Sequence, residues 1–222
     1  AYYYGGGTFP TVGDFVLLAW QQAGDSAIMR TLPRRSCFAR RDPTPGRVAQ
    51  AVAANFDTVL VAQSLNQDFN LSRLERTLAL ALQSGGAPVI LLTKADLCAD
   101  AQPYLAAVRQ RFPDVPALAV SAATGAGMAG LAPYLAPGRT LVILGSSGVG
   151  KSSLINALLG QDAQATAAIR AQDGKGRHTT TARQLLMLPG GGMIIGTHGL
   201  RGMGLLFARR GLPDSFAPVE EL

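Results

Sequence analysis

The sequence predicts an α/β protein with a mostly parallel sheet, helices on both of its faces, and part of a small β-barrel in front of it. Two observations lead to this fold class. From about residue 47 onward, short apolar runs alternate with segments of helical periodicity, which is typical of a parallel sheet. Residues 1–46 instead contain strand-like runs separated by turns, with no helical period. We therefore divide the chain into a partial barrel with a linker, 1–46, and an α/β domain, 47–222.

The individual elements follow from local patterns. In the first part, 12–20 and 27–32 are expected as strands, too few to close a barrel. In the second part, Asn70 is a plausible N-cap for a helix that carries Leu71, Leu74, Leu78 and Leu82 at helical spacing. The remaining expected segments are strands at 57–63, 88–92, 117–120 and 140–144, a hairpin of 184–188 with 193–195, and helices at 104–112, 128–135 and 153–159.

Composition narrows the class of protein. With 222 residues, 48% of them hydrophobic, the chain can bury a sizeable core. Charged residues or prolines interrupt every apolar run, so we expect no membrane span, and no signal peptide is recognisable. Cys37 and Cys98 form neither a disulfide framework nor a zinc set, which fits the reducing cytoplasm. The net charge of +6 suits a nucleic-acid partner.

One basic cluster has two interpretations, which we weigh equally. Arg34, Arg35, Arg40 and Arg41 surround Phe38. They form either an RNA-facing strand or loop, with Phe38 stacking on a base, or a solvated linker.

The chain is organised around residues 145–152, which match the phosphate-binding pattern G-x-x-x-x-G-K-[ST]. An apolar strand precedes the match and a helix follows it, which argues against an ordinary Gly/Ser turn. Lys151 is expected to reach the β- and γ-phosphates, and the Ser152 hydroxyl to bind Mg²⁺. The residues expected to hold the nucleotide phosphates are Gly145, Ser146, Ser147, Gly148, Val149, Gly150, Lys151, Ser152 and Ser153.

A second motif, Thr93-Lys94-Ala95-Asp96, follows an apolar strand and selects the base. The Asp96 carboxylate can accept hydrogen bonds from both the ring N–H and the amine of guanine, a donor pair that adenine lacks. Thr93 stands where such motifs usually have Asn. Lys94 is expected along the base plane, and a backbone N–H of Ser121-Ala122 at the guanine carbonyl. GTP or GDP is therefore the expected ligand.

The order of these motifs is unusual, because the base-reading residues precede the phosphate loop. This order predicts a circularly permuted P-loop GTPase, in which residues 134–139 join the former ends. Downstream, residues 174–181 are either a switch that closes on Mg²⁺ and the γ-phosphate or a flexible polar loop, and we favour the switch. Within it, Thr180 is a candidate Mg²⁺ ligand and His178 a candidate to orient water or stabilise transition-state charge, with His198 a weaker one.

Together these residues resemble the ribosome-small-subunit-dependent GTPase A family. The resemblance extends over most of the chain, through Pro-Thr-Val-Gly-Asp at 10–14, Pro-Arg-Arg-Ser at 33–36, Gln-Ser-Leu-Asn at 63–66 and Arg-His-Thr-Thr-Thr at 177–181. It implies an oligonucleotide-binding (OB) barrel, a permuted GTPase domain and a zinc module that follows it. It also implies late maturation of the small ribosomal subunit, contact with its rRNA, and GTP hydrolysis that the subunit stimulates.

Two departures bear on activity. Where the family has Asp-Thr-Pro-Gly, this chain has Gly196-Thr197-His198-Gly199, so the carboxylate that holds a Mg²⁺-bound water is missing. Gly199 remains able to donate its N–H to the γ-phosphate. The block indicates either a divergent switch or an unreliable stretch of sequence. The chain also lacks a Cys/His cluster, so we expect no zinc.

The sequence thus favours a monomeric, cytoplasmic GTPase acting in ribosome biogenesis. The alternative is a module that binds nucleotide and RNA but hydrolyses little, because of Gly196. A third hypothesis, an ATP-using P-loop protein, conflicts with Asp96.

Overall fold

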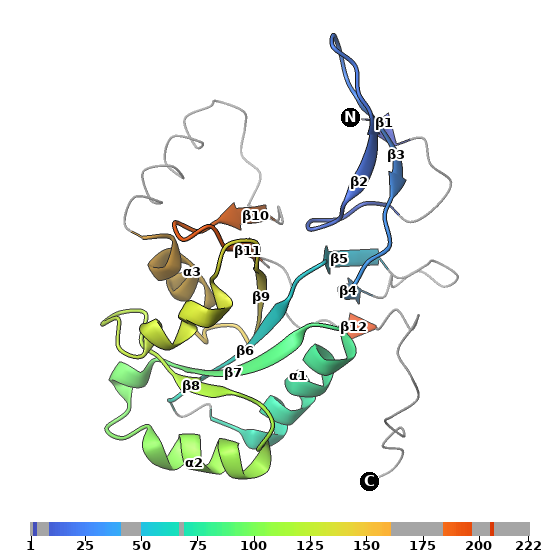
Figure 1. Cartoon of the computed structure of the whole chain (residues 1–222). Coiled ribbons are helices and arrows are strands. Elements are labelled where there is room, and N and C mark those ends of the chain that lie inside the picture. The colour runs from blue at the N-terminus through green and yellow to red at the C-terminus, as the bar shows by residue number, and fades with distance from the viewer. Residues whose placement is uncertain are drawn as a thin grey trace, which may run out of the picture.

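A six-stranded sheet forms the centre of the computed structural model, which describes residues 2–3, 9–40, 50–66, 69–160, 184–196 and 205–206 (Figure 1). The strand order is β10-β11-β9-β6-β7-β8, and every pair is parallel except β10 with β11. The mostly parallel sheet expected from the sequence is therefore confirmed. Its strands are β6 (Thr58–Ser64), β7 (Ala87–Thr93), β8 (Ala117–Ala119), β9 (Thr140–Leu144), β10 (Gln184–Met187) and β11 (Met193–Gly196).

Helices cover both faces of this sheet, because successive side chains of each buried strand point to opposite sides. Along β6, Val59 and Val61 pack in one core with α1 (Leu71–Gln83) and α2 (Gln102–Arg111). The intervening Leu60 packs in the other core, with α3 (Lys151–Leu159) and the 3-10 helix Met128–Tyr134. None of the described helices has the length and apolar character that crossing a membrane requires.

Helix α1 shows how the local signals operate. The Asn70 side chain accepts a hydrogen bond from the Arg73 N–H at 2.9 Å, so the predicted N-cap is confirmed. Leu74 and Leu78 are buried as the spacing predicted. Leu82 is 52% exposed, because Ala81 occupies the buried position at the end of the helix instead.

Asp57 aligns the amino ends of the central strands. Its N–H donates to the Thr140 carbonyl at 2.8 Å, and its carboxylate accepts from the Thr140 N–H at the same distance. Its carbonyl accepts from the Ala87 N–H, also at 2.8 Å. Asp57 therefore sets the relative position of β6, β7 and β9 at their amino ends.

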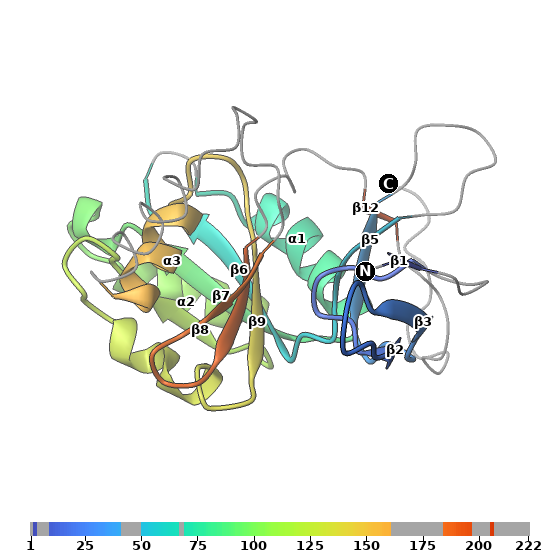
Figure 2. The same ribbon diagram turned by 90° about the horizontal axis from the view of Figure 1, so that it is seen from above.

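Two small sheets accompany the central one. The first has the order β1-β3-β2, and the second has the order β12-β4-β5 (Figures 1 and 2). Closure of the first sheet into an OB barrel stays a prediction, as does the domain boundary at 46/47, across which β4 and β5 pair. The strands are β1 (Tyr2–Tyr3), β2 (Val16–Ala19), β3 (Ala27–Thr31), β4 (Cys37–Arg40), β5 (Gln50–Ala54) and β12 (Leu205–Leu206).

The structure contradicts the interpretation of the basic cluster in which Phe38 stacks on a base, while the Arg40 side chain and Arg41 lie outside the described part of the chain. Phe38 is only 1% exposed and stacks on Phe56 at a centroid distance of 4.8 Å, so its ring cannot receive a base. Arg34 is occupied by an ion pair, described next, and Arg35 is exposed. The apolar Phe38 side chain is driven into the core, because β4 lies against the α1 side of the central sheet.

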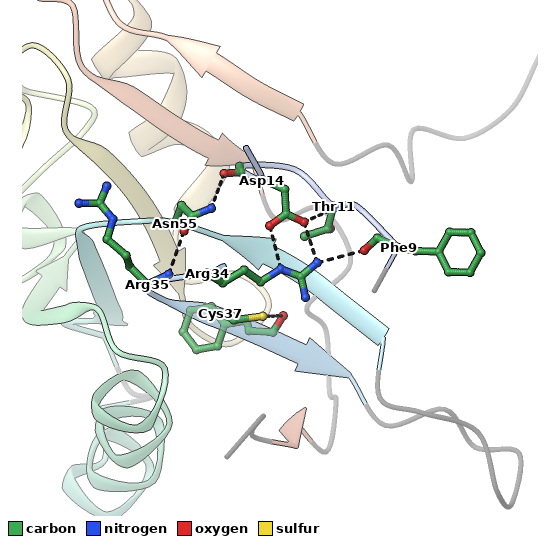
Figure 3. A network of polar contacts seen from close by, with 9 residues as sticks. Phe9, Thr11, Asp14, Arg34, Arg35, Cys37 and Asn55 are labelled. Atoms are coloured by element: carbon green, nitrogen blue, oxygen red, sulfur yellow. Dashed lines mark hydrogen bonds and ion pairs between the residues drawn. The ribbon is translucent and has the colours of Figure 1, made fainter. Parts of the chain in front are cut away.

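A polar network fixes the turn that leads into β2 (Figure 3). The Arg34 guanidinium forms two hydrogen bonds of 2.7 Å to the two oxygens of Asp14, and a third of 3.0 Å to the Phe9 carbonyl. Asn55, at a positive φ of 53°, donates its amide to the Gly13 carbonyl and accepts from the Arg35 N–H, each at 3.0 Å. These contacts seat the first small sheet on the chain that enters the central sheet.

Candidate functional site

The motifs predicted from the sequence meet at one edge of the central sheet. Thr93 ends β7, and Ser121 follows the end of β8. Gly145 follows β9, and Gly196 ends β11. All four strands are parallel, so their carboxyl ends lie at the same edge, where ligands of open α/β sheets bind.

The phosphate loop, residues 145–152, has the strand-loop-helix context that its pattern requires. A Cβ on Gly145 would lie 2.5 Å from the Ala62 carbonyl oxygen, so only glycine lets the loop leave β9 this close to β6. Gly150, at φ 92°, precedes α3 without any side-chain cap. Ser146, Ser147, Gly148, Ser152 and Ser153 are exposed, which leaves this helix N-terminus and its N–H groups open to an anion.

Lys151 folds back over the start of the loop. Its Nζ donates to the Gly145 carbonyl at 2.7 Å and to the Ser146 carbonyl at 2.6 Å. The lysine of this motif reaches the β- and γ-phosphates. The first two residues of the loop are therefore at the end of the site that takes the terminal phosphates.

Thr93, which stands where this motif usually has Asn, makes hydrogen bonds that the sequence did not predict. Its buried hydroxyl donates to the Val149 carbonyl at 2.6 Å and lies 3.4 Å from the Gln63 carbonyl. Val149 belongs to the phosphate loop, so this hydroxyl ties β7, which carries the predicted base-reading motif, directly to that loop. The contact spans 56 residues of sequence, and no local pattern predicts it.

Lys94 lies between the two halves of the site. Its backbone adopts the left-handed conformation, with φ 59° and ψ 40°. A Cβ built on Gly150 would have the Lys94 Cε as its nearest atom, at 3.9 Å. The lysine stem thus runs alongside the phosphate loop, where a base plane can lie against it.

Asp96 is held by Ser121. The Ser121 hydroxyl donates to Asp96 Oδ1 at 2.5 Å and accepts from the N–H groups of Ala123 and Thr124 at 3.2 and 3.1 Å. Ser121 is fully buried, whereas Asp96 is exposed. The sequence predicted a backbone role at residues 121–122, but it gave no sign that the Ser121 side chain would orient the carboxylate.

The other predicted residues cannot be placed. His178, Thr180, His198 and Gly199 lie outside the described residues, so their roles stay predictions. Gly196 is described and buried at the end of β11, with no carboxylate to offer a metal. Within the described part of the chain, no group of three or more His, Cys, Asp or Glu side chains could hold a metal ion.

A hollow beside the phosphate loop was not predicted. It opens between β6, α1 and the start of the loop; of its α1 residues, the helical spacing singled out Leu74, and only as part of the helix pattern. Its lining includes Ser64, Arg73, Leu74, Thr77, Gly145, Ser146 and Val149.

Comparisons with known proteins agree with this arrangement. A family model described as RsgA GTPase matches residues 31–206. The "Small ribosomal subunit biogenesis GTPase RsgA" of Streptomyces avermitilis is 50% identical over 95% of this chain and 57% of its own length. Its namesake in Methanosarcina acetivorans is 45% identical over 96% of this chain and 58% of its own length. The chain thus spans less than two thirds of these curated relatives.

Two solved structures resemble the whole arrangement. YjeQ from Thermotoga maritima has a TM-score of 0.63 and 28% identity, over 87% of this chain and 62% of that one. YloQ, described as a circularly permuted GTPase, has a TM-score of 0.59 and 21% identity, over 90% of this chain and 64% of that one. At 21% identity, the likeness to YloQ concerns the fold alone. A circularly permuted fold agrees with the order of the motifs in this chain. The chain belongs to the RsgA GTPase family and has the circularly permuted GTPase fold of that family.

Proposed function

We propose that this chain binds GTP and GDP at the carboxyl edge of its central sheet, hydrolyses GTP, and acts in late maturation of the small ribosomal subunit. One observation carries the nucleotide assignment. Asp96 is oriented by Ser121, while Thr93 of the same motif bonds to the phosphate loop through Val149. Base and phosphate recognition are thereby joined at a fixed separation.

Each residue has a role in this proposal. The free edge of the Asp96 carboxylate accepts from the guanine ring N–H and amine. Within the described residues no acceptor meets the Ala122 N–H, which we assign to the guanine carbonyl. The Lys94 stem lies along the base. The open N–H groups of the phosphate loop and the start of α3 hold the phosphates, and Lys151 neutralises their terminal charge.

Magnesium fits this donor set in part. Ser152 is exposed in the first turn of α3, next to the loop, and its hydroxyl would hold Mg²⁺ together with phosphate oxygens. Bound there, the ion would neutralise charge on the phosphates. Gly196 contributes no ligand from β11, so we assign the remaining protein ligand to Thr180 and the placing of water to His178.

The proposed partner is the small ribosomal subunit with its rRNA. The relatives are named for biogenesis of that subunit, and the net charge of +6 favours an anionic partner. In this proposal the chain acts as a monomer in the cytoplasm. Binding that weakens steeply with salt would support direct rRNA contact, and binding insensitive to salt would contradict it.

A module that binds nucleotide with little hydrolysis is the less favoured alternative. It rests on Gly196, which replaces the carboxylate expected from the family resemblance. Against it, the curated relatives are named GTPases. Measuring GTP turnover with Mg²⁺, with and without purified small subunits, separates the two, because only the enzyme shows stimulated turnover.

The guanine assignment is tested by an Asp96→Asn variant. It replaces an acceptor for two charge-assisted hydrogen bonds, so GDP affinity should fall about 100-fold, or about 3 kcal/mol. Asp114→Asn is the control, because Asp114 is an exposed carboxylate that follows α2. ATP should compete poorly with GDP in the unaltered chain. Equal affinity for ATP and GTP, or an unchanged GDP affinity in Asp96→Asn, would remove the guanine assignment.

A further inference from the structure

The hollow beside the phosphate loop is lined by both apolar and polar residues. It lies where the carboxyl end of β6, helix α1 and the first residues of the loop approach one another. Leu74 and Val149 are buried lining residues, whereas Arg73, Thr77, Gly145 and Ser146 are lining residues that are partly or fully exposed. Gly145 and Ser146, the two loop residues that Lys151 contacts, therefore line this hollow together with Arg73 from α1.

Arg73 is held in place by its backbone. Its N–H bonds to the Asn70 side chain at 2.9 Å, and its carbonyl accepts from the Thr77 hydroxyl at 3.0 Å. The residue is half-buried on the first turn of α1. The capped first turn of α1 thus fixes the backbone position of Arg73.

The guanidinium of Arg73 makes no hydrogen bond or ion pair with any described residue, unlike three other arginines. Arg34, Arg111 and Arg139 each lie within 4 Å of a carboxylate. Among the described residues no carboxylate neutralises the charge of Arg73, so this charge is available to an anionic ligand.

The position of Lys151 indicates which part of a bound nucleotide would lie near Arg73. Its Nζ contacts the carbonyls of Gly145 and Ser146, the same two residues that line the hollow with Arg73. Since Lys151 belongs with the β- and γ-phosphates, Arg73 approaches the terminal-phosphate end of the loop from the α1 side.

We propose that Arg73 is a specificity-determining residue that favours the nucleoside triphosphate over the diphosphate at this site. The inference rests on the proposed binding of guanine nucleotides and adds a residue to it. GTP carries more negative charge than GDP, and the extra charge sits at the terminal phosphate. A cation near that end therefore stabilises bound GTP more than bound GDP.

The test is a pair of dissociation constants for each variant, measured with Mg²⁺ for GDP and for a non-hydrolysable GTP analogue. Arg73→Gln keeps a polar side chain without the charge, and Arg73→Lys keeps the charge. Arg76→Gln is the matched control, because Arg76 is exposed on the same helix. Thermal unfolding of each variant shows that the fold is retained.

In Arg73→Gln we expect affinity for the GTP analogue to fall about tenfold and affinity for GDP to change less than about twofold. Arg73→Lys should retain most of the preference, and Arg76→Gln all of it. An equal change for both nucleotides, no change, or a loss in Arg73→Lys as large as in Arg73→Gln would overturn the inference alone. Failure of the unaltered chain to bind either nucleotide would overturn the proposed function together with it.

Discussion

Replacement of Arg34 by Ala should destabilise the fold far more than replacement of its neighbour Arg35. The Asp14 side chain is completely buried, and 16% of the Arg34 side chain is exposed. In Arg34→Ala, the Asp14 carboxylate loses both guanidinium hydrogen bonds and keeps the Thr11 N–H at 2.8 Å. The variant therefore leaves a buried charge with one neutral donor (Figure 3).

The magnitude follows from this geometry. Removing one partner of a buried ion pair costs about 3–5 kcal/mol, because the remaining charge is left uncompensated. Arg34 lies close enough to solvent for water to replace part of it, which places the expected cost near the lower limit, about 3 kcal/mol. For a chain of this size that corresponds to a fall of about 6–12 °C in Tm. The hydrogen bond to Asp14 also raises the pKa of Arg34 above its ordinary value, although burial opposes the shift, so Arg34 stays charged at neutral pH.

Thermal unfolding followed by circular dichroism measures the effect. Arg35→Ala is the control: its side chain is exposed, and its backbone N–H still bonds to Asn55 in the variant. We expect Arg35→Ala to shift Tm by less than about 2 °C. Equal Tm values for the two variants would refute the reasoning, because they would mean that water satisfies Asp14 as well as Arg34 does.

Two further predictions concern single side chains. Gly196→Asp should raise Mg²⁺-dependent GTP turnover at least about tenfold, since it adds a carboxylate beside the proposed metal site; among the described residues its Cβ would meet only the Gln184 carbonyl, at 3.7 Å. Gly190→Asp, in the turn before β11, is the control, and unchanged turnover in Gly196→Asp would contradict the prediction. Burial raises the pKa of the Cys37 thiol above its ordinary value of 9.0, with the charge of Arg34 opposing the shift. The folded state then holds that proton longer than the unfolded state, so Tm should fall as pH rises above 9.0 and should fall less in Cys37→Ala; identical pH profiles would contradict this.

The sequence predicted the central sheet well because its signals there are local. The N-cap at Asn70 and the buried Leu74 and Leu78 follow from spacing within one helix. The edge on which the motifs meet follows from parallel strands, each ending at its own motif. Strand β5 was missed, because its sequence, Gln-Ala-Val-Ala-Ala, is short and rich in alanine, and its pairing with β4 depends on tertiary context.

The interactions that tune the site were not predictable, because they join residues far apart in the chain. The Thr93 hydroxyl donates to the carbonyl of Val149, which lies 56 residues further along the chain. The Ser121 hydroxyl donates to Asp96, which lies 25 residues earlier. One of the two interpretations of the sequence placed Phe38 against an RNA base, yet its stacking on Phe56 buries it. In each case the residue type was informative, but the partner that decides its role becomes adjacent only in the folded chain.

The same long-range packing connects the turn before the first small sheet to β11, the strand that ends at Gly196. A Cβ on Gly13 would lie 2.0 Å from the Ala54 carbonyl oxygen and 3.2 Å from Ile195 Cδ1, so the turn rests directly on β5 and β11. Ile195 immediately precedes Gly196, the end of β11 at the nucleotide edge. Because close-packed contacts transmit displacement, movement of β11 would press on this turn, which the Asp14–Arg34 ion pair holds in position. The ion pair is therefore part of the packing that joins this turn to β5 and β11.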